Sequence, residues 1–149
     1  MNKKLFYAPP EKTHVIEGFV DTGPRRKILV LDDEVALVDL TRAILEKSGY
    51  EVDTAFDGVQ GIKKIMAGDY SVILCDMVMP NLDGEMFYTA VERVKPHLCK
   101  RFLFMTGYRG DRKVDDFIRK VRGLILWKPF QSHVLVESIQ AVEHKCGPL

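Results

Sequence analysis

The sequence lacks a charge excess of either sign, a long apolar run and any paired cysteines. With 22 basic and 21 acidic residues, its formal net charge is only +1. It therefore gives no support for direct binding to nucleic acid, which normally needs a clear basic excess. Its apolar runs are far shorter than the ~20 residues that a membrane-spanning helix requires. Residues 1–7 begin like a signal peptide, but Pro9 and Pro10 follow before an adequate apolar stretch. We expect a cytoplasmic protein without direct contact to a membrane.

The three cysteines, Cys75, Cys99 and Cys146, are odd in number and lack CxxC spacing. This pattern is typical of reduced thiols and argues against a disulfide framework or a zinc site. The four histidines are scattered and show no metal-ligand spacing either. The chain does have 46% hydrophobic residues over its 149 positions. That composition is enough for one globular domain with a buried core.

Residues 1–26 differ from the rest of the chain because they contain several prolines and glycines and show little periodicity. We interpret them as an N-terminal tail or a linker between domains. Within them, residues 15–16 and 19–20 are candidates for a short strand or for packing on the domain. Residues 27–145 then form one domain, and residues 146–149 form a C-terminal tail.

From residue 27 on, short apolar runs rich in branched residues alternate with segments whose apolar residues recur at helical spacing. Such runs are typical of strands buried on both faces of a parallel sheet. Asp57 is placed to cap a helix, and Gly49 and Gly68 are placed to end helices. Five strand and helix units predict an α/β fold, a doubly wound five-stranded parallel sheet with helices on both faces. The expected strands are residues 27–31, 52–56, 70–76, 102–105 and 124–127.

Charged residues stand where three of these strands are expected to end. Asp32 and Asp33 follow the first run, Asp76 ends the third, and Lys128 follows the fifth. In open parallel sheets, ligands bind outside the carboxyl ends of the strands. Carboxylate oxygens suit Mg²⁺, which keeps open positions for phosphate, so these residues predict a magnesium site that handles phosphate. Taken singly, each residue also fits a helix start or a turn. Their occurrence together at one sheet edge favours the site.

Four short segments carry this pattern further: residues 28–34, 73–84, 104–107 and 127–130. In order and content they resemble the receiver domains of two-component response regulators and hybrid sensor kinases, over about residues 26–145. The resemblance implies a flavodoxin-like strand order of 2-1-3-4-5. It also implies a signalling role in which a phosphoryl group switches a partner-binding surface.

The same resemblance assigns roles to the charged residues. Asp76 matches the phosphoacceptor, whose donor is a phosphohistidine on a histidine kinase or a histidine phosphotransfer protein. Asp32 and Asp33 match the acidic pair that holds Mg²⁺ with Asp76, and the backbone carbonyl of Val78 matches a further ligand. Lys128 matches the cation that contacts a phosphoryl oxygen, a task suited to its compact charge.

The resemblance also assigns a hydroxyl to the site. Thr106 matches the group that binds the phosphoryl oxygen once transfer has occurred, so the expected catalytic set is Asp76, Lys128 and Thr106. The peptide bond between Lys128 and Pro129 is expected to be cis, which only a bond before proline readily allows.

The chain departs from the family at three positions that modulate signalling. Ile125 stands where many receivers carry an aromatic residue. Without that aromatic residue, the sequence does not determine how phosphorylation at the site changes the surface. Trp127, two residues on, is expected to face the same side of the strand as Ile125. Val78 and Tyr108 match the side chains that flank the approach of water to the phosphorylated aspartate. The downstream partner is unknown, and a homodimer is compatible with the sequence.

Three alternative functions can be compared with the sequence. A phosphatase of the haloacid dehalogenase type also uses an aspartate nucleophile, but it needs a second acid two residues on, where this chain has Val78. A binding module that works without phosphorylation would not need the intact acid set. A flavin-binding protein would need a phosphate-cradling loop after the first strand, and the sequence has none. We expect a signalling domain that catalyses only its own phosphorylation and slow dephosphorylation, which is not an enzyme in the usual sense.

Overall fold

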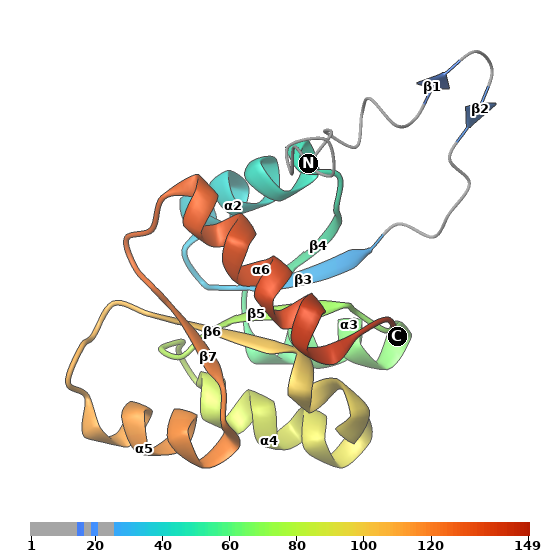
Figure 1. Cartoon of the computed structure of the whole chain (residues 1–149). Helices are drawn as coiled ribbons and strands as arrows, with labels where there is room; N and C mark the ends of the chain where they lie inside the picture. Colours follow the sequence, from blue (N-terminus) through green and yellow to red (C-terminus); the bar gives the residue numbers. More distant parts are fainter. Residues whose placement is uncertain (1–14, 17–18, 21–25) are drawn as a thin grey trace.

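The computed structural model describes residues 15–16, 19–20 and 26–149 (Figure 1). Most of the segment expected to be a tail or linker, residues 1–26, therefore lies outside the described residues. Two short strands within it, β1 (Val15–Ile16) and β2 (Phe19–Val20), pair with each other in antiparallel fashion. They form a sheet of their own and do not extend the main sheet.

The main sheet has five parallel strands in the order β4-β3-β5-β6-β7. Numbered from β3 onward, this is the order 2-1-3-4-5 that the resemblance implies. The second strand of the domain lies one residue earlier than the predicted 52–56, because Glu51 pairs with Lys27 at the start of the parallel ladder. The strands are β3 (Lys27–Leu31), β4 (Glu51–Ala55), β5 (Val72–Asp76), β6 (Phe102–Thr106) and β7 (Leu124–Trp127).

Helices cover both faces of this sheet, as Figure 1 shows: α2 and α6 lie on one face, and α3, α4 and α5 lie on the other. Asp57 caps α3 by accepting a hydrogen bond from the N–H of Gln60, as the sequence predicts. A short 3-10 helix, η2, was not expected from the sequence. The helices are α2 (Val35–Lys47), α3 (Gly58–Ala67), α4 (Gly84–Val94), η2 (Pro96–Arg101), α5 (Arg112–Val121) and α6 (Ser132–Cys146).

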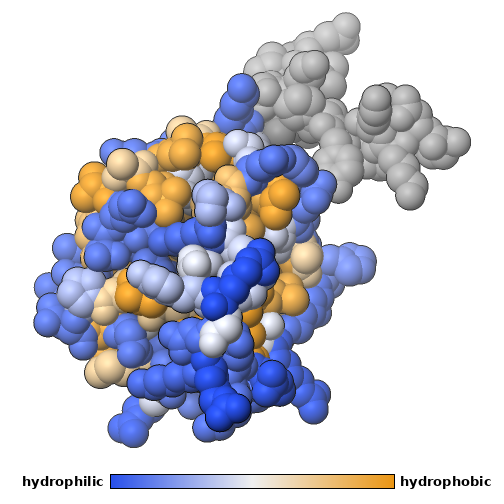
Figure 2. All heavy atoms as spheres, turned by 90° about the vertical axis from the view of Figure 1, so that its left-hand side faces the viewer, coloured by the Kyte–Doolittle hydropathy of each residue, from blue (hydrophilic) through white to orange (hydrophobic). Residues whose placement is uncertain are grey.

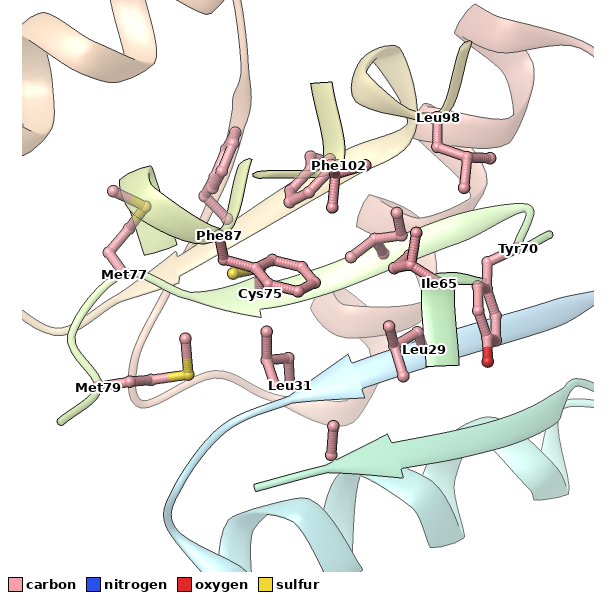
Figure 3. Close-up of a cluster of buried hydrophobic side chains, with 14 of the residues drawn as sticks. Leu29, Leu31, Ile65, Tyr70, Cys75, Met77, Met79, Phe87, Leu98 and Phe102 are labelled. Carbon is pink, nitrogen blue, oxygen red and sulfur yellow. The ribbon is translucent and has the colours of Figure 1, made fainter. Parts of the chain in front are cut away.

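The alternation of side chains along each strand divides the core into two clusters, one on each face of the sheet. In β5, Ile73 and Cys75 pack in the cluster under α3, α4 and α5 (Figure 3), whereas Val72 and Leu74 pack in the cluster under α2 and α6. All five residues of β5 are buried. Burying an aliphatic side chain of this size contributes about 1.5–3 kcal/mol, so β5 contributes strongly to the stability of the fold that carries Asp76.

Aromatic side chains fasten two helices to the sheet near its β7 side. The ring of Tyr88, on α4, lies edge-on to Phe102 and Phe117, with centroids 5.0 and 5.4 Å apart. Phe104 meets Phe117, from α5, in the same way at 5.5 Å. Such edge-to-face pairs add to the stabilisation that burial itself provides.

Two expectations about the whole chain can be compared with the structure. Cys75, Cys99 and Cys146 are unpaired, which agrees with the expectation of reduced thiols. Of the helices in residues 15–16, 19–20 and 26–149, none has the length and apolar character needed to cross a membrane.

Candidate functional site

Three carboxylates meet at the edge of the sheet where the strands end. Asp32 directly follows β3 and Asp76 is the last residue of β5, and both are buried, with 0% and 5% of their surface exposed. Asp33 is exposed. One oxygen from each of the three carboxylates lies within 4.8 Å of the others. The sequence prediction that these acids share one spot is therefore confirmed in geometry.

Lys128 brings a positive charge to the same spot from the end of β7. Its Nζ lies 2.7 Å from Oδ2 of Asp32 and 3.2 Å from Oδ2 of Asp76. Its backbone N–H donates to the carbonyl of Thr106 at 2.9 Å, which continues the ladder between β6 and β7. The bond between Lys128 and Pro129 is cis, as predicted. The lysine thus joins the two buried carboxylates.

Backbone amides hold the two buried carboxylates in place. The N–H of Val78 donates to Oδ1 of Asp76 at 3.1 Å, and the N–H of Glu34 donates to Oδ1 of Asp32 at 3.0 Å. Hydrogen bonds to a charged acceptor are stronger than those between neutral groups. Each acid therefore keeps one oxygen fixed by the backbone and presents the other to Lys128.

The crowding of charge shifts the protonation of the site. Burial and the charge of Asp32 raise the pKa of Asp76 to about 6, although Lys128 and the Val78 N–H oppose that rise. Burial works against the charge on Lys128, but the hydrogen bond to Asp32 and the charge of Asp76 outweigh it and raise the pKa of the lysine. Two acids with one lysine leave a net negative charge, which a divalent cation would relieve.

The donor set at this edge fits Mg²⁺. Asp32, Asp33 and Asp76 offer hard carboxylate oxygens within reach of one another, and Mg²⁺ binds through one or two carboxylates while keeping water and phosphate as other ligands. Val78 directly follows the loop residue Met77, next to Asp76. The use of its backbone carbonyl as a ligand remains a prediction.

Thr106 lies at the end of β6, beside the acids. It is buried, with 1% of its surface exposed, and its Oγ1 accepts a hydrogen bond from the N–H of Tyr108 at 3.2 Å. A Cβ added at Gly107 would meet nothing closer than the Lys128 Cβ at 3.8 Å. Gly107, next to Thr106, therefore has open space beside its Cα.

The three modulating positions differ in how exposed they are. Val78 and Tyr108 are exposed, at 49% and 63%, and the backbone N–H of each donates to a site residue, Asp76 or Thr106. Ile125 is partly buried and packs on the core cluster under α3, α4 and α5, while its neighbour Leu126 packs on the opposite cluster. The aliphatic residue at position 125 is thus a core residue.

One positioning residue escaped the sequence analysis. Gly84 begins α4, and a Cβ there would lie 2.7 Å from the backbone carbonyl oxygen of Asp76 and 2.8 Å from the Cα of Met77. Its N–H also donates to the carbonyl of Met77 at 3.1 Å. The segment after Asp76 therefore lies directly against the start of α4. The sequence shows a glycine after the capping residue Asp83, but it does not show what that glycine touches.

Comparison with known proteins places this geometry in context. The family model of the response regulator receiver domain matches residues 28–140. Over 123 residues, the chain is 38% identical to the transcriptional regulatory protein DltR of Streptococcus agalactiae, covering 76% of this chain and 50% of that protein. Over 136 residues it is 24% identical to the sensor kinase CckA of Brucella abortus, covering 90% of this chain and 14% of that one.

A solved structure has a similar fold. The chemotaxis protein CheY4 of Vibrio cholerae superposes with a TM-score of 0.74 and 28% identity, covering 80% of this chain and 99% of the other. The chain spans about half the length of curated relatives such as DltR.

Proposed function

This chain belongs to the response regulator receiver domain family of two-component systems, and on that premise we propose that Asp76 accepts a phosphoryl group in an Mg²⁺-dependent reaction. The observation that carries the proposal is the placement of Asp76. It is a buried carboxylate at a strand end, within 4.8 Å of two further acids and 3.2 Å from a lysine amine. A buried aspartate with a purely structural role would not be expected to lie beside two further acids, because their charges repel one another.

The chemistry follows from the residues. A carboxylate oxygen of Asp76 forms a bond to phosphorus, and the bond from phosphorus to the donor histidine nitrogen breaks with its electron pair on the imidazole. Mg²⁺, held by Asp32, Asp33 and Asp76, would supply neutralisation of the oxygens during transfer. Lys128 contacts a phosphoryl oxygen as a point charge, which requires it to turn from its carboxylate partners. Positioning and charge are most of what a protein contributes to this transfer.

After transfer, Thr106 takes up its role. Its hydroxyl lies beside the open space at Gly107, where a Cβ would find no close contact. The hydroxyl can donate to a phosphoryl oxygen, since an O–H that accepts from an amide still has its proton to give. The attached group then stabilises a different arrangement of the segment after β6. This is the step by which a receiver changes its partner surface.

The proposed phosphoryl donor is a histidine kinase or a histidine phosphotransfer protein. Figure 2 views the edge of the molecule that carries the site and shows hydrophobic residues gathered in its upper part, where Figure 1 places α2 and α6. Val35 and Leu40 on α2 and Val134 on α6 are exposed apolar residues of these helices. An apolar surface beside the acceptor is suited to docking a helical donor. We also propose that the receiver acts on a downstream protein and that it is located in the cytoplasm. The proposal allows for a homodimer.

The proposed role is that of a signalling domain that reacts once per phosphoryl group, without turnover of a substrate. A phosphatase of the haloacid dehalogenase type would need an acid at Val78, and valine cannot protonate a leaving group. Stoichiometric labelling supports the signalling role. Continuous turnover of a generic phosphate ester would support the phosphatase.

The test uses a small phosphoryl donor, acetyl phosphate. Intact-mass measurement should show one added phosphoryl group in the presence of Mg²⁺, and none after chelation or in Asp76→Asn. Asp39→Asn is a matched control, because Asp39 is an exposed acid on α2 outside the site. Labelling that persists in Asp76→Asn would contradict the assignment of the acceptor.

A further inference from the structure

Arg109 and Trp127 form a stacked pair at the surface beside the site. The guanidinium carbon of Arg109 lies 4.2 Å from the centroid of the Trp127 ring. Arg109 belongs to the segment between β6 and α5, whereas Trp127 is the last residue of the edge strand β7. The contact thus joins two separate pieces of chain at the end of the sheet where the site lies. A cation over the face of an indole ring is the strongest form of this interaction.

Both members of the pair are tied to residues of the site. Trp127 stands opposite Thr106 in the ladder between β6 and β7, and it directly precedes Lys128. Arg109 directly follows Tyr108, whose N–H donates to Oγ1 of Thr106 at 3.2 Å. Thr106 is therefore connected to one partner through the ladder and to the other through its own side chain.

The strand that carries Trp127 offers no other aromatic side chain. β7 reads Leu124, Ile125, Leu126 and Trp127, and Ile125 is packed into the core. An aliphatic core residue has no exposed ring whose position could report on the site. Trp127 is the single tryptophan of the chain, and it is only partly buried.

We propose that the Arg109–Trp127 pair relays the state of Asp76 from Thr106 to the surface formed by residues 107–111 and β7. The relay rests on the proposed phosphorylation of Asp76. When the Thr106 hydroxyl is drawn toward a phosphoryl oxygen, the Tyr108 N–H either follows it or loses its acceptor. In both cases residues 107–109 move. The β7 backbone stays fixed by its ladder, so the guanidinium shifts relative to the indole ring.

The experiment uses beryllofluoride, which takes the place of a phosphoryl group on an aspartate. Its binding to the full chain with Mg²⁺ is measured by fluorine NMR, independently of Trp127. The response of Trp127 is measured by its fluorescence emission and by the chemical shift of its indole N–H, against a control with Mg²⁺ alone. Arg109→Gln removes the charge over the ring. Arg112→Gln is the matched control, because Arg112 is an exposed arginine at the start of α5.

We expect beryllofluoride to change the emission and the indole shift in the wild type and in Arg112→Gln. In Arg109→Gln the emission change should fall to a small fraction of the wild-type value while beryllofluoride still binds. Binding without any change at Trp127 would overturn the relay, as would an undiminished change in Arg109→Gln. Failure of the wild type to bind beryllofluoride with Mg²⁺ would contradict the proposed function itself and remove the basis of the relay with it.

Discussion

The amine of Lys128 lies closer to Asp32 than to the proposed acceptor Asp76, at 2.7 Å against 3.2 Å. The lysine therefore serves first as the counterion of an acid that accepts no phosphoryl group. A divalent cation bound by Asp32 would compete with the lysine for the same oxygen charge. Cation binding and the freeing of Lys128 for a phosphoryl oxygen are thus linked in one site.

Replacing Lys128 by Met should separate cation binding from phosphoryl transfer. Loss of a positive charge near the acids should tighten Mg²⁺ binding about fivefold, since two charges at this range interact by about 1 kcal/mol even in water. Labelling by acetyl phosphate should slow about a hundredfold, because a charge aimed at the transferring group is lost. Isothermal titration with Mg²⁺ and mass-based labelling rates measure both effects.

Lys47→Met, at the far end of α2, is the control for loss of charge alone. Weaker Mg²⁺ binding in Lys128→Met than in this control would show that the lysine does not compete with the cation.

Asp76→Asn should stabilise the protein at alkaline pH when no divalent cation is present. The pKa of Asp76 is about 6 in the folded protein, above its ordinary 3.8. The folded state therefore binds this proton more tightly, and the stability this provides is present below about pH 4 and lost as the pH rises through about 6. At pH 8 the amide should raise the free energy of unfolding by about 1–2 kcal/mol, after allowance for solvent screening.

Urea denaturation in the presence of a chelator, at pH 8 and at pH 4, provides the measurement. The difference between variant and wild type should be much smaller at the lower pH, where Asp76 keeps its proton in the folded state and is already partly protonated in the unfolded state. An equal difference at both values would mean that charge on Asp76 is not its origin.

Thr106→Ala should leave labelling of Asp76 largely intact and weaken its effect on the surface. The hydroxyl acts after transfer, and its loss also removes the acceptor of the Tyr108 N–H, which should cost about 1 kcal/mol of stability. Backbone chemical shifts of α5 and β7 with and without beryllofluoride measure the response, which Ile125 should keep modest. Thr89→Ala, which removes an exposed hydroxyl on α4, is the control. A large rearrangement of α5 and β7 in Thr106→Ala would refute the coupling role.

Val78→Asn and Tyr108→Ala should each shorten the lifetime of the phosphorylated state. Valine cannot hydrogen-bond a water, and the tyrosine is bulky enough to obstruct its path to the phosphorus. We expect decay to speed up by about tenfold, or about 1.4 kcal/mol in the barrier. Both side chains are exposed, so the fold should tolerate the changes. The decay of labelled protein is followed by mass, and unchanged rates in both variants would show that these positions do not set the lifetime.

Gly84→Ala should disturb the site through the backbone. The added Cβ would lie 2.7 Å from the carbonyl oxygen of Asp76, which is backbone and cannot easily give way. Overpacking of this kind costs about 1–3 kcal/mol, and a displaced Asp76 should also label more slowly. Gly68→Ala is the matched control, because a Cβ there meets nothing within 4 Å. Equal stability and labelling in the two variants would show that the contact is not tight.

Much of this arrangement was predictable because it depends on local pattern and on strand ends. The runs before Asp32 and Asp76 are apolar and short, so the parallel strands and their carboxyl ends could be assigned, and the acids with them. Lys128 and its cis bond to Pro129 followed from the family resemblance. In each case the residues that determine the feature lie next to it in the sequence.

The features that escaped prediction depend on residues distant in sequence. The 3-10 helix η2, which begins at Pro96, is a partial exception, because it is local but has no apolar period to reveal it. Arg101 is 2% exposed because it donates to backbone carbonyls of Ser71, Gly147 and Pro148, and no sequence pattern marks backbone acceptors. The contact of Arg109 with Trp127 likewise joins segments that only the fold brings together.

The division of the core by the sheet has a consequence for the order of events in signalling. The exposed apolar residues of α2 and α6 lie over one face, whereas the Arg109–Trp127 pair joins the end of β7 to the segment that leads into α5, which covers the other. A donor docked on α2 would leave the Trp127 surface accessible. The phosphoryl donor and the downstream protein could then bind the receiver at the same time. The downstream protein would not have to wait for the donor to dissociate. The lifetime of such a ternary complex, and not only that of the phosphorylated aspartate, would then limit how fast the pathway responds.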